Sequence, residues 1–159
     1  MDELRIINIA DAPAVCHPHR STSIDFEPPG VEWPDTGINV QVMAPGQPNC
    51  KYHSEPVQED FLVLHGDCIA IVDGEEKHLR QWDLLHCPAG VPHVLVGAGD
   101  GPSAVLMIGS RRLDEAFYPV DAAAARYTAS VQRETSDPAE AYAEWRQVPR
   151  RPTDNPWPL

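Results

Sequence analysis

Short stretches of apolar and β-branched residues alternate with turn residues along the centre of the chain. Residues 38–43, 59–65 and 69–72 are three such stretches, and Asp73-Gly74 after the third is a hairpin signal. No helical periodicity interrupts this centre. Regular short strands without intervening helices are typical of sandwiches and barrels, so the pattern predicts an all-β fold. The other strands expected in this region are residues 52–55, 76–80, 84–87, 92–98 and 103–109.

The pattern changes at both ends of the chain. Residues 4–9 and 21–26 are candidate additional strands before the central series. In the last third, Asp121 is a plausible N-cap for an Ala-rich helix, and Asp137-Pro138 has the cap-then-proline order of a second helix start. The final residues, VPRRPTDNPWPL, predict a proline-rich strap or a disordered tail.

Length and pattern together predict one domain built from three segments. The chain has 159 residues, enough for a single core of ordinary size. Residues 1–36 are expected to supply strands and a loop that pack on a β-barrel formed by residues 37–118. Residues 119–159 are expected to form a C-terminal helical segment and the tail.

Charge and hydropathy exclude two classes of partner. The formal net charge is −12, and no basic cluster is longer than Arg111-Arg112 or Arg150-Arg151, so no nucleic acid or anionic membrane is expected as a partner. No apolar run reaches the roughly 20 residues that span a bilayer. The N-terminus MDELRIINIA is acidic and lacks a signal-peptide pattern, which favours a cytoplasmic location.

The cysteines and most histidines have ordinary interpretations. Cys16, Cys50, Cys68 and Cys87 show no CxxC spacing and are expected to be free thiols, with Cys87 a small buried residue. The Cys16-His17-Pro18-His19 segment is interpreted as an exposed loop rather than a metal site. Satisfied or exposed polar roles are expected for the remaining histidines His65, His78 and His86.

Four residues in the centre form a candidate metal site. His53 and Glu55 are two apart in a predicted strand and share a face, Glu59 opens the next strand after the Pro56 turn, and His93 follows a PAGVP turn. Closing these strands into a barrel brings their inward faces together. Two imidazoles with one or two carboxylates are the donor set of a two-His-one-carboxylate site with open positions.

The segments that carry these residues resemble the paired motifs of the cupin superfamily. The first motif is G-x5-H-x-H-x3/4-E-x6-G, and His53, Glu59 and Gly66 match it in register. The second is G-x5-P-x-G-x2-H-x3-N, which Pro88, Gly90 and His93 match. The resemblance covers roughly residues 38–110 and implies a double-stranded β-helix or jelly-roll barrel.

The chain departs from the family pattern at four positions. Glu55 stands in place of the second histidine, and Gly46 lies one residue too far from His53. Trp82 replaces the glycine that opens the second motif, and Gly97 replaces its closing asparagine. Two carboxylates close together without a cation raise each other's pKa, so the Glu55–Glu59 pair favours a metal. Glu55 is therefore either a direct ligand or a group that faces the substrate beside the metal.

The donor set and the resemblance are compatible with several metals and several functions. The oxygen ligands favour one Fe(II) or Mn per chain, with Zn, Ni or Co acceptable. The resemblance to single-domain cupin dioxygenases, including 3-hydroxyanthranilate dioxygenase, implies an Fe(II)-type dioxygenase of a small molecule, aromatic ones among the candidates, with Glu59 or Glu55 as the proton acceptor. The alternatives are a non-catalytic ligand-binding or metal-binding cupin and a metal-dependent isomerase, epimerase or lyase.

The residues around the site predict a small-molecule partner and a dimer. By the two-residue period, Phe61, Val63 and Leu95 point inward with the metal donors and are either a ligand pocket or simply barrel core. Met43 and Val105 or Met107 could complete such a lining. A homodimer is expected by family resemblance, with Trp33 and Trp145 offering apolar surface outside the barrel.

Overall fold

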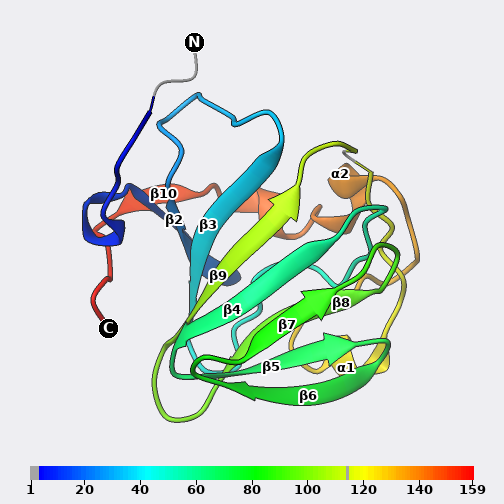
Figure 1. The fold of residues 1–159 in the computed structure, drawn as a ribbon. Coiled ribbons are helices and arrows are strands. Elements are labelled where there is room, and N and C mark those ends of the chain that lie inside the picture. The colour runs from blue at the N-terminus through cyan, green and yellow to red at the C-terminus, as the bar shows by residue number, and fades with distance from the viewer. Residues whose placement is uncertain (1–3, 114) are drawn as a thin grey trace.

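The computed structural model describes residues 4–113 and 115–159 and is built from two antiparallel β-sheets (Figure 1). The larger sheet has the strand order β10-β1-β2-β3-β9-β4-β7, and the smaller has the order β6-β5-β8. The strands are β1 (Ala14–His17), β2 (Arg20–Asp25), β3 (Thr36–Met43), β4 (Glu59–His65), β5 (Asp67–Val72), β6 (Glu75–Arg80), β7 (Leu84–Cys87), β8 (His93–Ala98), β9 (Ser103–Ser110) and β10 (Arg151–Thr153).

The two sheets face each other across a hydrophobic core. Phe61, Val63 and Val105 from the larger sheet pack with Cys68 and Leu95 from the smaller one. These are alternate residues of their strands, as the two-residue period requires. The prediction of an all-β double-stranded β-helix with short C-terminal helices is confirmed.

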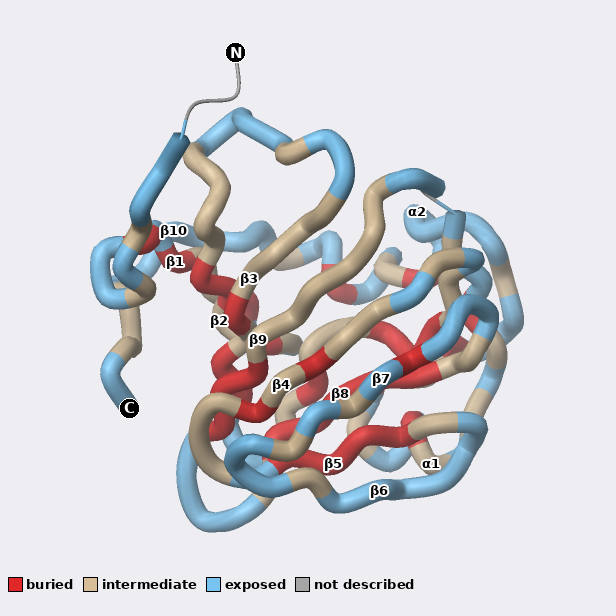
Figure 2. The backbone as a smooth tube through the Cα atoms, viewed as in Figure 1, coloured by how far each residue is buried: buried red, intermediate tan, exposed pale blue. Residues whose placement is uncertain are grey.

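Strands β5 and β8 are buried on both faces, which Figure 2 shows as red tube beside the exposed β6. Their outer face, with Ile71 and Val94, packs against Ala124 and Ala129 from the segment after β9. This double burial explains why both strands are continuously apolar in sequence, whereas β6 is mostly polar.

The segment between β3 and β4 runs along the free edge of β8. It forms isolated bridges at Pro45–Gly97, Pro48–Val96 and His53–His93. The last bridge is a reciprocal pair: the His53 N–H donates to the His93 carbonyl at 3.1 Å, and the His93 N–H donates to the His53 carbonyl at 2.8 Å. The predicted strand over residues 52–55 is therefore only a pair of single bridges, yet it fixes His53 opposite His93.

The short helices begin at the predicted residues. Helix α1 (Ala122–Ala125) is capped by Asp121, whose side chain accepts from the Ala124 N–H at 2.8 Å. Helix α2 (Pro138–Ala141) is capped by Asp137, which accepts from the Ala139 N–H at 2.7 Å. Two 3-10 turns, η1 (Ile9–Asp11) and η2 (Trp145–Gln147), complete the elements. None of the helices in the described residues is both long enough and apolar enough to traverse a membrane.

Several expectations about the two ends are wrong. Residues 4–9 form no strand in the structure. Of the two forms predicted for the tail, the structure shows an ordered strap, which contributes β10 and pairs with β1 at the edge of the larger sheet. His17 is not in an exposed loop: it is buried in β1, with Nε2 3.0 Å from the Trp145 carbonyl oxygen and Nδ1 accepting from the His19 N–H. Trp145 is itself only 5% exposed and offers no dimer surface.

Trp82 occupies a left-handed turn that the family motif gives to glycine. Its φ is 75°, and its side chain is 67% exposed, so burial does little to offset the strain. We expect Trp82→Gly to raise the free energy of unfolding by about 1 kcal/mol, because glycine adopts this φ without a Cβ clash. Urea unfolding of both proteins measures the difference. A variant less stable than the parent would show that the indole makes contacts worth more than the strain.

Candidate metal centre

Three of the four predicted donors converge at one end of the two sheets. His53, Glu59 and His93 each place a ligand atom within 4.8 Å of the other two. Glu59 is the first residue of β4, His93 is the first residue of β8, and the backbone bridge holds His53 against His93. On the neighbouring β9, Gly109 pairs with Glu59 across the ladder.

Both imidazoles are oriented by backbone carbonyls two residues earlier. His53 Nδ1 lies 2.8 Å from the Lys51 carbonyl oxygen, and His93 Nδ1 lies 3.0 Å from that of Val91. A carbonyl only accepts, so each Nδ1 carries the proton and each Nε2 presents a lone pair. The same arrangement orients histidines that bind metals. The Cys87 thiol, 3.3 Å from His93 Nδ1, adds a weak contact on the same side.

The lone pairs meet at Glu59. His93 Nε2 lies 3.0 Å from Glu59 Oε2, and His53 Nε2 lies 4.0 Å from the same oxygen. Both Glu59 Oε2 and His93 Nε2 are buried, and apart from this mutual contact neither has a hydrogen-bond partner among the described residues. Two buried lone pairs that face each other require a cation between them, either a proton or a metal ion. This donor set fits a divalent metal, with positions left for water or substrate.

The electrostatics of the metal-free site indicate that a proton takes the place of the cation. Burial opposes the charge on His93, but the contacts with Cys87 and Glu59 outweigh it and raise the pKa of His93 to about 10. Burial alone would raise the pKa of Glu59, yet the two histidines lower it. A bound metal would therefore displace a proton held between His93 and Glu59.

Glu55 lies beside the cluster rather than within it. Its Oε1 is 3.4 Å from His53 Nε2, but it does not join the mutual cluster of the other three donors. The residue lines a separate hollow of about 620 Å³ together with Phe117 and Tyr118. Its backbone carbonyl accepts from the Gly90 N–H at 2.7 Å, which ties the two motif segments together.

The apolar residues expected to line a ligand pocket are mostly core. Phe61, Val63 and Leu95 are at most 2% exposed and pack between the sheets. A pocket of about 360 Å³ reaches His53 and Glu59, and of the expected apolar residues only Met107 lines it. Polar side chains of β2 and β3 form much of its remaining wall, and Arg111 and Arg150 reach it from outside these strands. The sequence did not predict the β2 and β3 side of this wall, because the alternation of the two strands does not reveal which face points inward.

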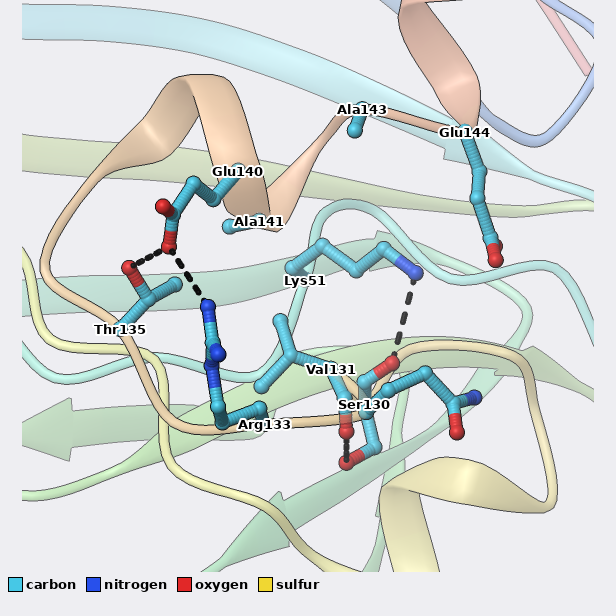
Figure 3. Close-up of a pocket in the computed structure, with 10 residues that line it drawn as sticks. Lys51, Ser130, Val131, Arg133, Thr135, Glu140, Ala141, Ala143 and Glu144 are labelled. Atoms are coloured by element: carbon cyan, nitrogen blue, oxygen red, sulfur yellow. Dashed lines mark hydrogen bonds and ion pairs between the residues drawn. The ribbon is translucent and has the colours of Figure 1, made fainter.

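Lys51 connects the metal centre to the C-terminal segment. Its carbonyl holds His53, while its buried ammonium donates to the Thr128 carbonyl at 2.9 Å and the Ser130 carbonyl at 3.4 Å. The ammonium also lies 4.4 Å from the centroid of the Trp145 ring. Figure 3 shows this side chain reaching between Ser130 and Glu144 at the wall of a pocket of about 470 Å³. Burial lowers the pKa of Lys51, and Glu144 opposes that shift.

We expect Lys51→Met to lower the free energy of unfolding by about 1–3 kcal/mol, because two carbonyls lose a charged donor while the aliphatic packing is kept. Metal stoichiometry should not change, since His53 is held by the backbone of residue 51 and not by its side chain. Denaturant unfolding measures the loss. Lys77→Met is the matched control, because Lys77 is exposed and its ammonium pairs with Glu75 on the surface. Equal stability of the two variants would contradict the role given to Lys51.

A comparison with family models finds one match, described as a cupin domain, over residues 39–109. These residues include all of β4, β5, β6, β7 and β8 and most of β3 and β9, together with all three clustered donors. This central part of the chain therefore matches the cupin domain. A search of curated proteins finds no significant match to the chain.

Solved structures share the cupin fold at low sequence identity. The polyketide cyclase RemF from Streptomyces resistomycificus superposes with a TM-score of 0.61 at 14% identity, over 72% of this chain and 84% of that one. An uncharacterized double-stranded β-helix protein from Klebsiella pneumoniae superposes with a TM-score of 0.57 at 20% identity, over 68% of this chain and 90% of that one. A cupin sugar phosphate isomerase from Silicibacter pomeroyi superposes with a TM-score of 0.51 at 23% identity, over 64% of this chain and 71% of that one.

Coverage is lower for one further match. The chain spans about half (54%) of a candidate sugar phosphate isomerase from Acidithiobacillus ferrooxidans, at 24% identity and a TM-score of 0.48. The three structures with TM-scores of 0.51 or more share a fold with this chain.

Proposed function

We propose that this cupin is a metal-dependent enzyme of small molecules, with one divalent ion held by His53, Glu59 and His93. The observation that carries the proposal is a contact between two buried atoms, His93 Nε2 and Glu59 Oε2, which face each other at 3.0 Å and have no other hydrogen-bond partner among the described residues. When bound, such an ion supplies Lewis-acid stabilisation of a substrate oxygen, and Fe(II) supplies dioxygen chemistry as well. The protein itself orients both imidazoles and shields the ligand atoms from bulk water.

Two reaction classes fit this site. The two-His-one-carboxylate donor set supports an Fe(II)-type dioxygenase, with Fe(II) or Mn as the first choices of metal. The polar walls of the adjoining pocket support a metal-assisted isomerase, epimerase or lyase acting on a polar molecule instead. Oxygen uptake by the Fe(II)-loaded protein during a substrate screen separates them. Turnover without oxygen consumption would remove the dioxygenase from consideration, and binding without turnover would favour a ligand-binding cupin.

We further propose that Glu55 accepts a proton beside the metal rather than binding it, because it lies outside the mutual cluster of donors. Glu55→Gln should then keep one metal per chain with an affinity within about 10-fold of the parent, whereas Glu59→Gln should weaken binding by more than about 100-fold. Competition with a fluorescent chelator measures both affinities. Equal losses in the two variants would make Glu55 a fourth ligand.

The remaining proposals concern partners. We propose a homodimer in the cytoplasm, and sedimentation equilibrium that returns a monomer would refute the dimer. We also propose residues 37–118 as the barrel segment. This interval contains β4 through β9 and all of β3 except its first residue, while β1, β2 and β10 extend the larger sheet.

A further inference from the structure

The pocket that reaches the proposed metal site has polar walls where a β-barrel interior is ordinarily apolar. Asp25 of β2 and Asn39 and Gln41 of β3 line it, and the Gln41 amide donates to Asn39 Oδ1 at 2.6 Å and to Ser23 Oγ at 3.1 Å. A hydrogen-bonded wall of this kind is costly to bury against an apolar ligand. The pocket therefore suits a polar molecule.

The same strands carry their apolar residues on the opposite face. Ile24, Val40 and Val42 are buried there, where they pack with Ala12 and Ala14 and are covered in part by Trp157. The usual arrangement is thus reversed over β2 and β3, with polar side chains toward the interior and apolar ones outside beneath the two chain ends. The reversal makes room for polar contacts without loss of apolar burial.

Three arginines gather at this pocket in a chain whose formal net charge is −12. Arg111 is already neutralised, because its guanidinium donates to both Glu27 oxygens at 2.6 and 2.7 Å. Arg20 and Arg150 are different: among the described residues neither guanidinium has a carboxylate within salt-bridge distance, and Arg20 lies 5.8 Å from the Tyr142 ring centroid. Both are free to bind an incoming anion.

The two guanidinium groups come from distant parts of the chain and repel each other. Arg20 opens β2, and Arg150 precedes β10 in the tail. Partial desolvation lowers the pKa of Arg150, Arg20 lowers it further, and Asp25 opposes the shift. Asp25 is itself engaged by the Ser23 hydroxyl. An anion between the two arginines would relieve this repulsion through charge-assisted hydrogen bonds.

We propose that Arg20 and Arg150 bind the anionic group, a carboxylate or a phosphate, of a small substrate whose other end reaches the metal centre. This assignment rests on the proposed function for its metal end, and on the pocket for its anionic end. A volume of about 360 Å³ is at the small end of ligand pockets and the walls are polar, so we infer that the substrate is a small polar acid.

Isothermal titration of L-malate, 2-phosphoglycolate and the neutral polyol erythritol tests the proposal. Each probe is titrated into Mn(II)-loaded and metal-free protein, with metal content determined separately. We expect at least one anionic probe to bind the loaded protein about 10-fold or more tightly than erythritol. Which of the two anions binds more tightly shows whether the arginines prefer a carboxylate or a phosphate. Erythritol binding as tightly as both anions would overturn the proposal.

Arginine variants locate the anion. Arg20→Gln and Arg150→Gln should each weaken the binding of the anionic probe by about 10-fold or more, while metal content stays at the parental value. Arg133→Gln is the matched control, since Arg133 is exposed and its guanidinium lies 3.9 Å from Glu140. Anion affinity unchanged in both variants would overturn the proposal even if the metal binds. Arginine-dependent anion binding in a protein that takes up no metal would support this site and reject the proposed metal function.

Discussion

Replacing His93 by alanine is expected to remove the metal from the protein, with affinity falling by more than about 100-fold. Loss of a partner outside the ligand shell already costs about 10–100-fold, and in the proposed site His93 would supply a ligand atom directly. Its Nε2 is oriented by the Val91 carbonyl and lies 3.0 Å from Glu59 Oε2. Elemental analysis of the purified proteins, followed by chelator competition, measures the change. Any turnover found for the parent protein should disappear together with the metal.

A control must separate loss of the ligand from loss of the fold. His93→Gln removes the imidazole while a polar side chain of moderate size remains, and it should lose the metal as well. His86→Ala is the matched variant, because His86 is exposed on β7 and contacts Asp60 at 2.7 Å away from the cluster. It should keep one metal per chain. A folded His93→Ala protein with full metal content would reject the assignment of this ligand.

Gly97→Ala is expected to lower the free energy of unfolding by about 3 kcal/mol or more, a large effect for the addition of one methyl group. A Cβ at this position would lie 2.2 Å from the Ala44 carbonyl oxygen and 2.8 Å from its carbon. Both atoms are backbone, so relief requires β8 to move away from the segment that carries His53. Two hydrogen bonds hold that segment to β8: the Gly46 N–H donates to the Gly97 carbonyl at 2.8 Å, and the Gly97 N–H donates to the Gln47 carbonyl at 3.0 Å.

Gly101→Ala is the matched control for this substitution. A Cβ at Gly101 would meet nothing within 4 Å, so its free energy of unfolding should stay within about 0.5 kcal/mol of the parent. Guanidinium unfolding measures both variants. If Gly97→Ala were as stable as Gly101→Ala, the close contact between β8 and the Ala44 carbonyl would be wrong. The contact also explains why this chain cannot carry the family's asparagine at position 97.

The motif positions and central strands could be predicted because their signals are local. Strands β4 and β7 have the expected bounds, since apolar runs between turn residues mark both ends. His53 and His93 could be paired only through the resemblance to cupins, because the bridge between them joins residues 40 positions apart. The position of Glu55 outside the cluster could not be predicted, since a shared strand face does not fix how far a flexible carboxylate reaches.

The edges of the larger sheet were missed for a different reason. Strand β10 contains Pro152, which cannot donate to a ladder and argues against a strand unless the strand lies at an edge. Its partner β1 contains His17, whose burial depends on the carbonyl of Trp145 far away in sequence. The inward face of β2 and β3 was equally hidden, because the alternation of polar and apolar residues is the same for either orientation.

Anomalous diffraction from crystals grown with Mn(II) or Co(II) tests the central claim most directly. The account predicts one strong peak between His53 Nε2, His93 Nε2 and Glu59 Oε2, at about 2.0–2.3 Å from each atom. The same map reports whether Glu55 reaches the ion. A map with no peak at these residues, or with metal only at surface carboxylates, would contradict the metal centre and leave the cluster as a buried His–Glu pair that shares a proton.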